Sequence, residues 1–258
     1  MDTDEILKWI NLTGFPLEME AADAFREAGF YVRQSGTFPD PQSEKGREID
    51  VLAEDPDLMG ILNISFVVEC KSSSKPWVVL TSNDALASYS RIHAFGLTSN
   101  HAKDALFSKY PNLGRLSEYV EKPNKSGYGF RQAFSKDSDP AYTAAMSVIK
   151  ACHEISKDRP EQKIPKLTFS FPVIVVNSPL FECSRKRNGE LAVKEVLESE
   201  FLFSAHIPNP VSCQIKIVTR KSLGAFAMYA RNMATTIRME LDAEEDKIFE
   251  RHRSPPMS

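Results

Sequence analysis

Apolar residues along this chain recur with two different periods, and these periods divide the sequence into predicted helices and strands. Between residues 16 and 29, apolar side chains return every three or four positions, with Pro16 near the start and Gly29 at the end, so we expect a helix. Residues 30–38 and 48–53 are rich in strand-forming residues, and turn residues from 39 to 46 separate them. The chain therefore begins its predicted fold as a helix followed by two strands.

A long apolar run comes next. The segment ILNISFVVEC, residues 61–70, is apolar at consecutive rather than alternate positions, which predicts a central strand buried on both faces. Residues 141–156 then have the period of a helix, and residues 169–178 form another apolar, strand-like run. The remaining predicted elements are a hairpin of residues 180–186 and 190–196 joined through Asn188 and Gly189, a strand at 214–219, and a helix at 223–241.

These elements predict a single α/β domain over residues 1–258. We expect its core in residues 14–80 and 141–241, and an insertion in residues 81–140, where the pattern is weak. Within this insertion, the pattern predicts a helix near residues 102–109 and a loop around 123–129, which is rich in Gly, Ser and Asn. Hydrophobic residues make up 42% of the 258 residues, which is enough to bury a core and argues against a disordered chain.

Charge and cysteine content exclude several classes of protein. With 32 Lys and Arg against 35 Asp and Glu, the net charge of −3 excludes a protein that coats nucleic acid by bulk charge, but it allows a local basic groove. The four cysteines lie far apart without a CxxC pair, so neither a zinc ribbon nor a disulfide-rich secreted scaffold is expected. The acidic N-terminus and the lack of an apolar run of about 20 residues predict a cytoplasmic protein without membrane contact.

Two carboxylates and a lysine occur where the predicted strands meet. Side chains alternate along a strand, so Glu69 and Lys71 in VVECK share one face while Cys70 points to the other. In the preceding strand, EIDVLA, Glu48 and Asp50 likewise share a face, and a hairpin between the two strands places Asp50 opposite Glu69. We therefore expect Asp50, Glu69 and Lys71 to converge at the end of an apolar strand.

Such a cluster is costly to bury unless a cation neutralises it, because like carboxylates repel and each charge loses hydration. Carboxylate oxygens, a backbone carbonyl and waters are the ligands of a hard ion such as Mg²⁺. A lysine beside that ion can orient a water molecule and stabilise charge on a phosphoryl oxygen. This combination predicts metal-assisted hydrolysis of a phosphodiester.

An acidic helix followed by (R)EID and then (V)ECK resembles the PD-(D/E)XK nuclease superfamily, and the resemblance covers about residues 14–80. It implies a three-layer, restriction-endonuclease-like αβββαβ core, with a mixed central sheet and helices on both faces. It also implies that Asp50, Glu69 and Lys71 are catalytic. Asp50 and Glu69 would then hold Mg²⁺, or Mn²⁺ in its place, together with the backbone carbonyl of Cys70, and Glu18 would complete the ligand shell through water.

Two details qualify this resemblance. Ile49 precedes Asp50, so the literal Pro-Asp pair of the superfamily is missing. Glu18 is preferred to Glu20 because it lies eleven residues before Gly29, as in Mrr-like members, while Glu20 is about 160° further round the helix.

Other polar residues are weaker candidates for substrate binding. Ser72, Ser73 and Lys75 follow the ExK motif and are positioned to contact phosphates, although a polar strand end and a surface lysine explain them equally well. Trp77 is a candidate for base stacking, but packing against the core is the favoured interpretation. Gln132 and the basic turn at residues 185–187 are further candidates for contacts with nucleic acid, and the five histidines show no metal-ligand spacing.

The predicted function is a metal-dependent nuclease that hydrolyses phosphodiester bonds of nucleic acid. DNA is favoured over RNA as the substrate, and a homodimer or a protein partner is compatible with the sequence. The alternative is a nuclease-like module that binds nucleic acid or a protein in a defence or repair complex without cutting. A hydrolase of small phosphoesters is the least favoured, because the sequence has no Gly-rich phosphate loop. Fold alone does not decide between these functions.

Overall fold

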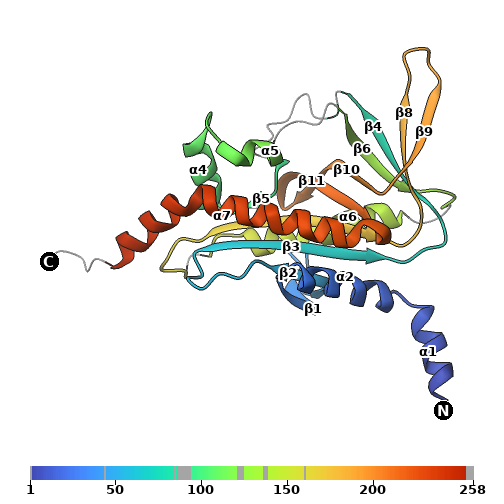
Figure 1. Ribbon diagram of the computed structural model, residues 1–258, viewed down its shortest axis with the longest axis horizontal. Helices are drawn as coiled ribbons and strands as arrows, with labels where there is room; N and C mark the ends of the chain where they lie inside the picture. The colour runs from blue at the N-terminus through green and yellow to red at the C-terminus, as the bar shows by residue number, and fades with distance from the viewer. Residues whose placement is uncertain are drawn as a thin grey trace.

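A large mixed sheet with helices on both of its faces forms the body of the protein (Figure 1). The computed structural model describes residues 2–43, 45–83, 85, 94–120, 125–135, 139–159 and 161–253. The N-terminal elements are α1 (Thr3–Asn11), α2 (Phe15–Glu27), β1 (Tyr31–Pro39), β2 (Gly46–Glu54), β3 (Leu62–Lys71) and β4 (Trp77–Ser82). The middle elements are β5 (Leu97–Thr98), α4 (Asn100–Lys109), a short 3₁₀ turn, α5 (Ser117–Val120), β6 (Ser126–Gln132) and α6 (Pro140–Ser156). The C-terminal elements are β7 (Leu167–Val176), β8 (Leu180–Arg185), β9 (Leu191–Val196), β10 (Glu198–Ile207), β11 (Asn209–Thr219) and α7 (Leu223–Arg253).

Eleven strands of the described residues form one sheet in the order β1-β2-β3-β7-β11-β10-β6-β4-β8-β9, and β5 pairs with β7 outside this path. The first three strands are antiparallel neighbours, whereas β3, β7 and β11 run parallel to one another. The elements α2-β1-β2-β3, followed later by α6-β7, have the order that the sequence predicts. The broad α/β class with a mixed sheet is therefore confirmed.

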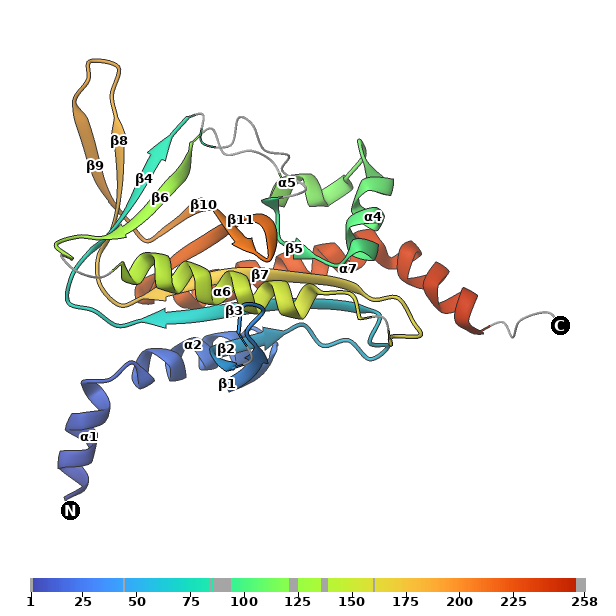
Figure 2. The ribbon, with the colours of Figure 1, turned by 180° about the vertical axis from the view of Figure 1, so that it is seen from behind.

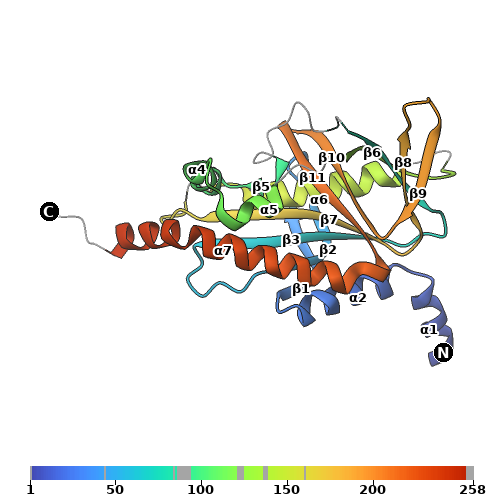
Figure 3. The ribbon, with the colours of Figure 1, turned by 45° about the horizontal axis from the view of Figure 1, so that its top comes forward.

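Two apolar layers hold the helices on the sheet. On one face, α2 and α7 pack against β2, β3 and β7 through residues such as Phe25, Phe66 and Phe226. On the other face, α6 packs through Ala144, Val148 and Ile149, which lie in a second core cluster. Figures 1 and 2 show α7 and α6 on opposite sides of the sheet, and Figure 3 shows α7 running alongside β3 and β7.

The central strands are buried as their composition predicts. Every residue of β7 is buried, and eight of the ten residues of β3 are buried. The predicted helices at 16–29, 102–109 and 141–156 correspond to α2, α4 and α6, and the predicted hairpin corresponds to β8 and β9. The four cysteines, Cys70, Cys152, Cys183 and Cys213, are free thiols, and three of them are buried.

Several elements differ from the sequence-based expectation. The loop expected at residues 123–129 is wrong from Ser126 onward, because this segment is strand β6; residues 123 and 124 lie outside the described part of the chain. Strands β4, β5 and β10 and helices α1 and α5 are absent from the predicted elements, and α7 continues from Leu241, its predicted end, to Arg253. Helix α1 projects from the body and buries none of its residues (Figure 1). None of the helices in the described ranges is long and apolar enough to cross a membrane.

Candidate active site

Strands β2 and β3 bring the predicted acidic residues together. Their antiparallel register pairs Val51 with Val68 and Leu52 with Val67, and one further step along this ladder places Asp50 opposite Glu69. Lys71 lies two residues after Glu69 on the same face, and its Nζ donates a hydrogen bond to Glu69 Oε1 at 2.5 Å. The side chain of Cys70 points the other way, into the core beneath α2 and α7.

Asp50 is held by the backbone of the facing strand. Its Oδ2 accepts a hydrogen bond from the Cys70 N–H at 2.7 Å, in a place where the two strands no longer pair through their main chains. Burial raises the pKa of Asp50 to about 7, and the negative charges of Glu69 and Glu18 raise it as well. The Cys70 N–H and Lys71 act in the opposite direction. Burial and the two neighbouring carboxylates thus favour the protonated form of Asp50 more than in a free aspartate.

Glu69 is fixed from two sides. The residue is 8% exposed, and while Oε1 accepts from Lys71, Oε2 accepts a hydrogen bond from Ser147 Oγ at 2.8 Å. Ser147 lies on α6, so the helix that covers this face of the sheet also sets the orientation of the carboxylate. Sequence reasoning missed Ser147, because the helical period of α6 does not say which strand its polar positions meet.

Glu18 approaches the same acidic group from the first turn of α2. Burial raises the pKa of Glu18, and the charges of Glu48 and Glu69 raise it further. Glu20 instead forms a bidentate ion pair with Arg220. Of Glu18 and Glu20, Glu18 is thus the one whose charge acts on the predicted site.

A pocket of about 460 Å³ opens between the strands and α6, and Glu48, Asp50 and Glu69 all line it. Its lining therefore places Asp50 and Glu69 on the same side of the sheet, as the strand alternation predicts. Neither Lys71 nor Glu18 is part of this lining, so these two residues lie beside Asp50 and Glu69 rather than in the pocket wall.

Two cations that sequence reasoning missed, Arg47 and Lys150, line the same pocket. Buried Asp40 holds both of them: its Oδ2 accepts from Arg47 Nε at 2.8 Å, and its Oδ1 lies 3.0 Å from Lys150 Nζ. Burial alone would raise the pKa of Asp40, but the N–H of Gln42 and these two cations hold it well below its usual range. Arg47 precedes the EID motif directly, so it was within reach of a sequence signal, whereas Lys150, one helical turn after Ser147, enters the pocket only through the docking of α6.

The residues after the ExK motif tie strand ends together. Ser72 Oγ accepts a hydrogen bond from Asn177 Nδ2 at 2.8 Å, and the Ser73 N–H donates to Asn177 Oδ1 at 2.9 Å. Lys75 Nζ donates to the Phe134 carbonyl at 3.1 Å. None of these three predicted phosphate contacts is part of the pocket lining.

The remaining weak candidates also lie outside that lining. Gln132 Nε2 donates to Ser73 Oγ at 2.9 Å. Trp77 is 1% exposed and stacks on Phe130 with ring centroids 5.1 Å apart, so the core interpretation of this residue is the correct one. The basic residues 185–187 lie at the end of the β8–β9 hairpin, which projects from the sheet (Figure 2).

The donor atoms present suit a hard cation. Within the described residues, no three His, Cys, Asp or Glu side chains stand already arranged around a common metal position. Asp50 nevertheless keeps Oδ1 free of the Cys70 hydrogen bond, and burial first, then the charge of Glu69, raises the pKa of this carboxyl. Carboxylate oxygens facing one another across two strands are ligands that Mg²⁺ and Mn²⁺ accept.

Comparison of the chain with protein-family models, with curated proteins and with solved structures finds no match. What the site does has to be inferred from its own side chains.

Proposed function

We propose that the protein is a Mg²⁺-dependent nuclease that hydrolyses phosphodiester bonds of nucleic acid, DNA rather than RNA, on a restriction-endonuclease-like core. The observation that carries this proposal is the pairing of Asp50 with Glu69 on one face, beside Lys71, at the edge of an open pocket. The raised pKa of Asp50 adds support, since strongly perturbed groups in a cleft mark functional sites.

Each side chain has a distinct role in this proposal. Asp50 and Glu69 would hold the ion together with the Cys70 carbonyl, and Glu18 would reach it through water. Bound there, Mg²⁺ supplies positive charge to the scissile phosphate and lowers the pKa of a water molecule. Lys71 orients the attacking water and offsets negative charge that develops on the phosphoryl oxygens. Ser147 keeps Glu69 in the orientation that both tasks need.

The cations on the pocket wall favour a polyanionic substrate. Arg47 projects from its ion pair with Asp40, with 59% of its side chain exposed, so its remaining N–H groups are open to a phosphate. Local positive charge of this kind permits binding of nucleic acid in a chain whose net charge is −3.

The test is cleavage by the purified protein of linear, circular, branched and single-stranded DNA, and of RNA, with Mg²⁺, Mn²⁺ or EDTA. We expect cleavage that EDTA abolishes. Lys71→Ala should lower the rate by about 10²-fold or more while it still binds the metal, because removal of one preorganised charge-stabilising group has an effect of this size. Lys163→Ala, a change of an exposed lysine outside the pocket lining, is the matched control and should cut as fast as the wild type.

A second measurement locates the ion independently of cleavage. Mn²⁺ or Mg²⁺ should raise the melting temperature of the wild type but not of Asp50→Asn, since ligand binding to the folded state stabilises it. Asp23→Asn, an exposed aspartate on α2, serves as the control and should respond as the wild type does. An equal rise in Asp50→Asn and the wild type would place the ion elsewhere and contradict the proposed site.

One observation favours the alternative, a nuclease-like module that binds nucleic acid or a protein without cutting. Both oxygens of Glu69 already accept hydrogen bonds, from Lys71 and Ser147, so this carboxylate has partners without any metal ion. The same substrate panel separates the two functions. If the wild type and Lys71→Ala both bind nucleic acid and neither cuts any substrate, the binding module is the correct interpretation.

A further inference from the structure

A second pocket, of about 350 Å³, lies on the opposite face of the sheet from the carboxylates. Strand register establishes this placement: Glu69 pairs with Ile174 on β7, and Lys216, which lines the second pocket, pairs with the adjacent Val173. Because neighbouring residues of a strand point to opposite faces, Lys216 and Glu69 lie on opposite sides of the sheet. The second pocket is thus a separate site, and no role in the proposed nuclease accounts for it.

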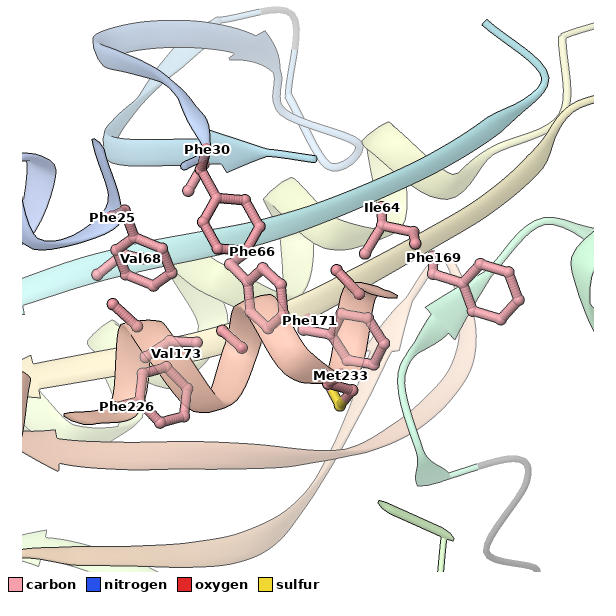
Figure 4. Packing of buried hydrophobic residues seen from close by; sticks show 14 of the residues in the cluster. Phe25, Phe30, Ile64, Phe66, Val68, Phe169, Phe171, Val173, Phe226 and Met233 are labelled. Carbon is pink, nitrogen blue, oxygen red and sulfur yellow. The ribbon is translucent and has the colours of Figure 1, made fainter. Parts of the chain in front are cut away.

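Aromatic rings form most of its apolar wall. Phe66 from β3 and Phe171 from β7 stack with centroids 5.1 Å apart, and Phe95 meets Phe171 edge to face at 5.1 Å. Figure 4 shows Phe66 and Phe171 directed toward α7, which contributes Phe226 and Met233. Such walls favour a flat, aromatic ligand.

Two tyrosines stand beside these rings. Tyr119 of α5 and Tyr229 of α7 have ring centroids 5.5 Å apart, and each lines the pocket. Tyr229 is 39% exposed, so its ring is accessible from solvent. Burial raises the pKa of Tyr229, so its hydroxyl is protonated and neutral at physiological pH.

One edge of the pocket is polar and is built by β10 and β11. Gln214 and Lys216 are two residues apart on one face of β11, and Glu200 of β10 pairs with Lys216. The Glu200 carboxylate accepts a hydrogen bond from Gln214 Nε2 at 3.0 Å and another from Lys216 Nζ. Burial lowers the pKa of Lys216, but Glu200 and Tyr229 raise it by more, so the ammonium keeps its charge.

Gln214 retains unused hydrogen-bonding capacity at this edge. One N–H of its amide is committed to Glu200, while within the described residues its Oε1 accepts no hydrogen bond. An amide offers two N–H donors and one carbonyl acceptor, so one donor and one acceptor remain side by side. This pair matches a base edge on which a ring nitrogen stands beside an exocyclic amine, as on adenine.

The charged side chains of the pocket lining then discriminate among ligands that carry such a base edge. Glu118 and Glu200 supply two carboxylates to the lining, against the single ammonium of Lys216 among its described residues. This excess of negative charge disfavours a phosphorylated ligand. We propose that the pocket binds an uncharged adenine-type base or nucleoside, with the ring among the aromatic side chains and its amine edge on Gln214.

Calorimetric titration with adenosine, inosine and AMP, in EDTA so that no phosphodiester cleavage takes place, tests this proposal apart from the nuclease. We expect adenosine to bind with a dissociation constant below about 1 mM, within the range of small-ligand sites. Inosine, which replaces the amine by a carbonyl oxygen, and AMP, which adds a phosphate, should each bind at least about tenfold more weakly.

Two variants connect this binding to the pocket. Gln214→Leu and Tyr229→Leu should each weaken adenosine binding by about tenfold or more, since lost base contacts and lost stacking have effects of this size. The matched controls are Gln162→Leu and Tyr31→Leu at exposed positions, which should bind as the wild type does, and circular dichroism verifies that all four variants are folded.

Any of three results would overturn the proposal: no adenosine binding to the wild type at 1 mM, undiminished binding by folded Gln214→Leu, or AMP binding as tightly as adenosine. A nuclease that fails this titration would still be a nuclease, and a protein that passes it while cutting nothing would retain the nucleoside site.

Discussion

Three aspartates on the N-terminal half of the sheet, of which Asp40 and Asp55 are buried and Asp50 is partly buried, differ in what faces them. Asp40 and Asp55 each meet two cations, which are Arg47 and Lys150 for the first and Arg231 and Arg238 for the second. Asp50 faces Glu69 instead, and its pKa rises to about 7, while that of Asp40 falls well below its usual range. This contrast supports the proposed role of Asp50 as a metal ligand.

Asp40→Asn should destabilise the protein by about 3 kcal/mol at pH 7, because it leaves the largely buried ammonium of Lys150 without its counter-ion. The folded-state pKa of Asp40 lies below its value of 3.8 in the unfolded chain, so its stabilising contribution is present above that pH and is lost as the pH falls further. Urea unfolding of both proteins between pH 7 and pH 2 measures this. The difference in unfolding free energy should shrink below about pH 4, and a constant difference would contradict the ion pairs.

The local sequence pattern predicts an element correctly where the packing around that element agrees with the pattern. It fails where contacts with distant segments determine the local structure. Strands β3 and β7 are predicted correctly because their apolar runs fit a strand with two buried faces. The glycines of β6 predict a loop, which is wrong. Gly127 is there because a Cβ at this position would lie 2.6 Å from Phe201 Cβ of β10, and this close approach leaves no local signal.

The residues of the candidate site also differ in whether the sequence predicts their positions. Strand alternation alone places Glu69 and Lys71 on one face and predicts the facing position of Asp50. Ser147 and Lys150 enter the site through the docking of α6 on this face of the sheet, which the sequence of that helix does not specify. Positions carried by paired strands were predictable, and those carried by a packed helix were not.

Helix α7 is fastened to the sheet by one buried charge as well as by its apolar face. Asp55, just beyond β2, pairs with Arg231 and Arg238, which lie two turns apart on α7. Asp55→Ala should lower the free energy of unfolding by about 3 kcal/mol, because it leaves two partly buried guanidinium groups without their partner. Urea denaturation followed by circular dichroism measures this. The control Asp23→Ala removes an exposed ion pair with Arg26 and should change stability by less than about 1 kcal/mol.

At the scale of the whole molecule, the sheet separates two pockets of different chemistry. The pocket lined by Asp50 and Glu69 lies on the side of α6, and the pocket lined by Phe66 and Phe171 lies on the side of α7. Helix α1 lines neither pocket and projects away from the sheet and the helices packed on it (Figure 1). The stability of the body should therefore not depend on α1.

Deletion of residues 2–12 should change the free energy of unfolding by less than about 1 kcal/mol, because α1 buries no residue and its Trp9 is 59% exposed. Trp77, at 1% exposed, remains as a fluorescence reporter of unfolding in urea. Phe25→Ala, which removes a fully buried ring on α2, is the contrasting variant and should lose about 3–5 kcal/mol. A loss of similar size on deletion of α1 would show that this helix packs against the body.

Both edge strands of the sheet carry features that oppose the pairing of a further strand. The strand at one end, β9, exposes unpaired backbone groups together with Leu191 and Val193, but Lys194 and Glu195 stand among them. At the other end, the pairing of β1 with β2 is interrupted at Ser35 without a change of register, and the φ of 50° at this residue takes the edge strand out of the extended conformation and kinks it. A strand from another copy would have to desolvate two charges at one edge and follow a kink at the other, which protects this wide sheet against edge-to-edge aggregation.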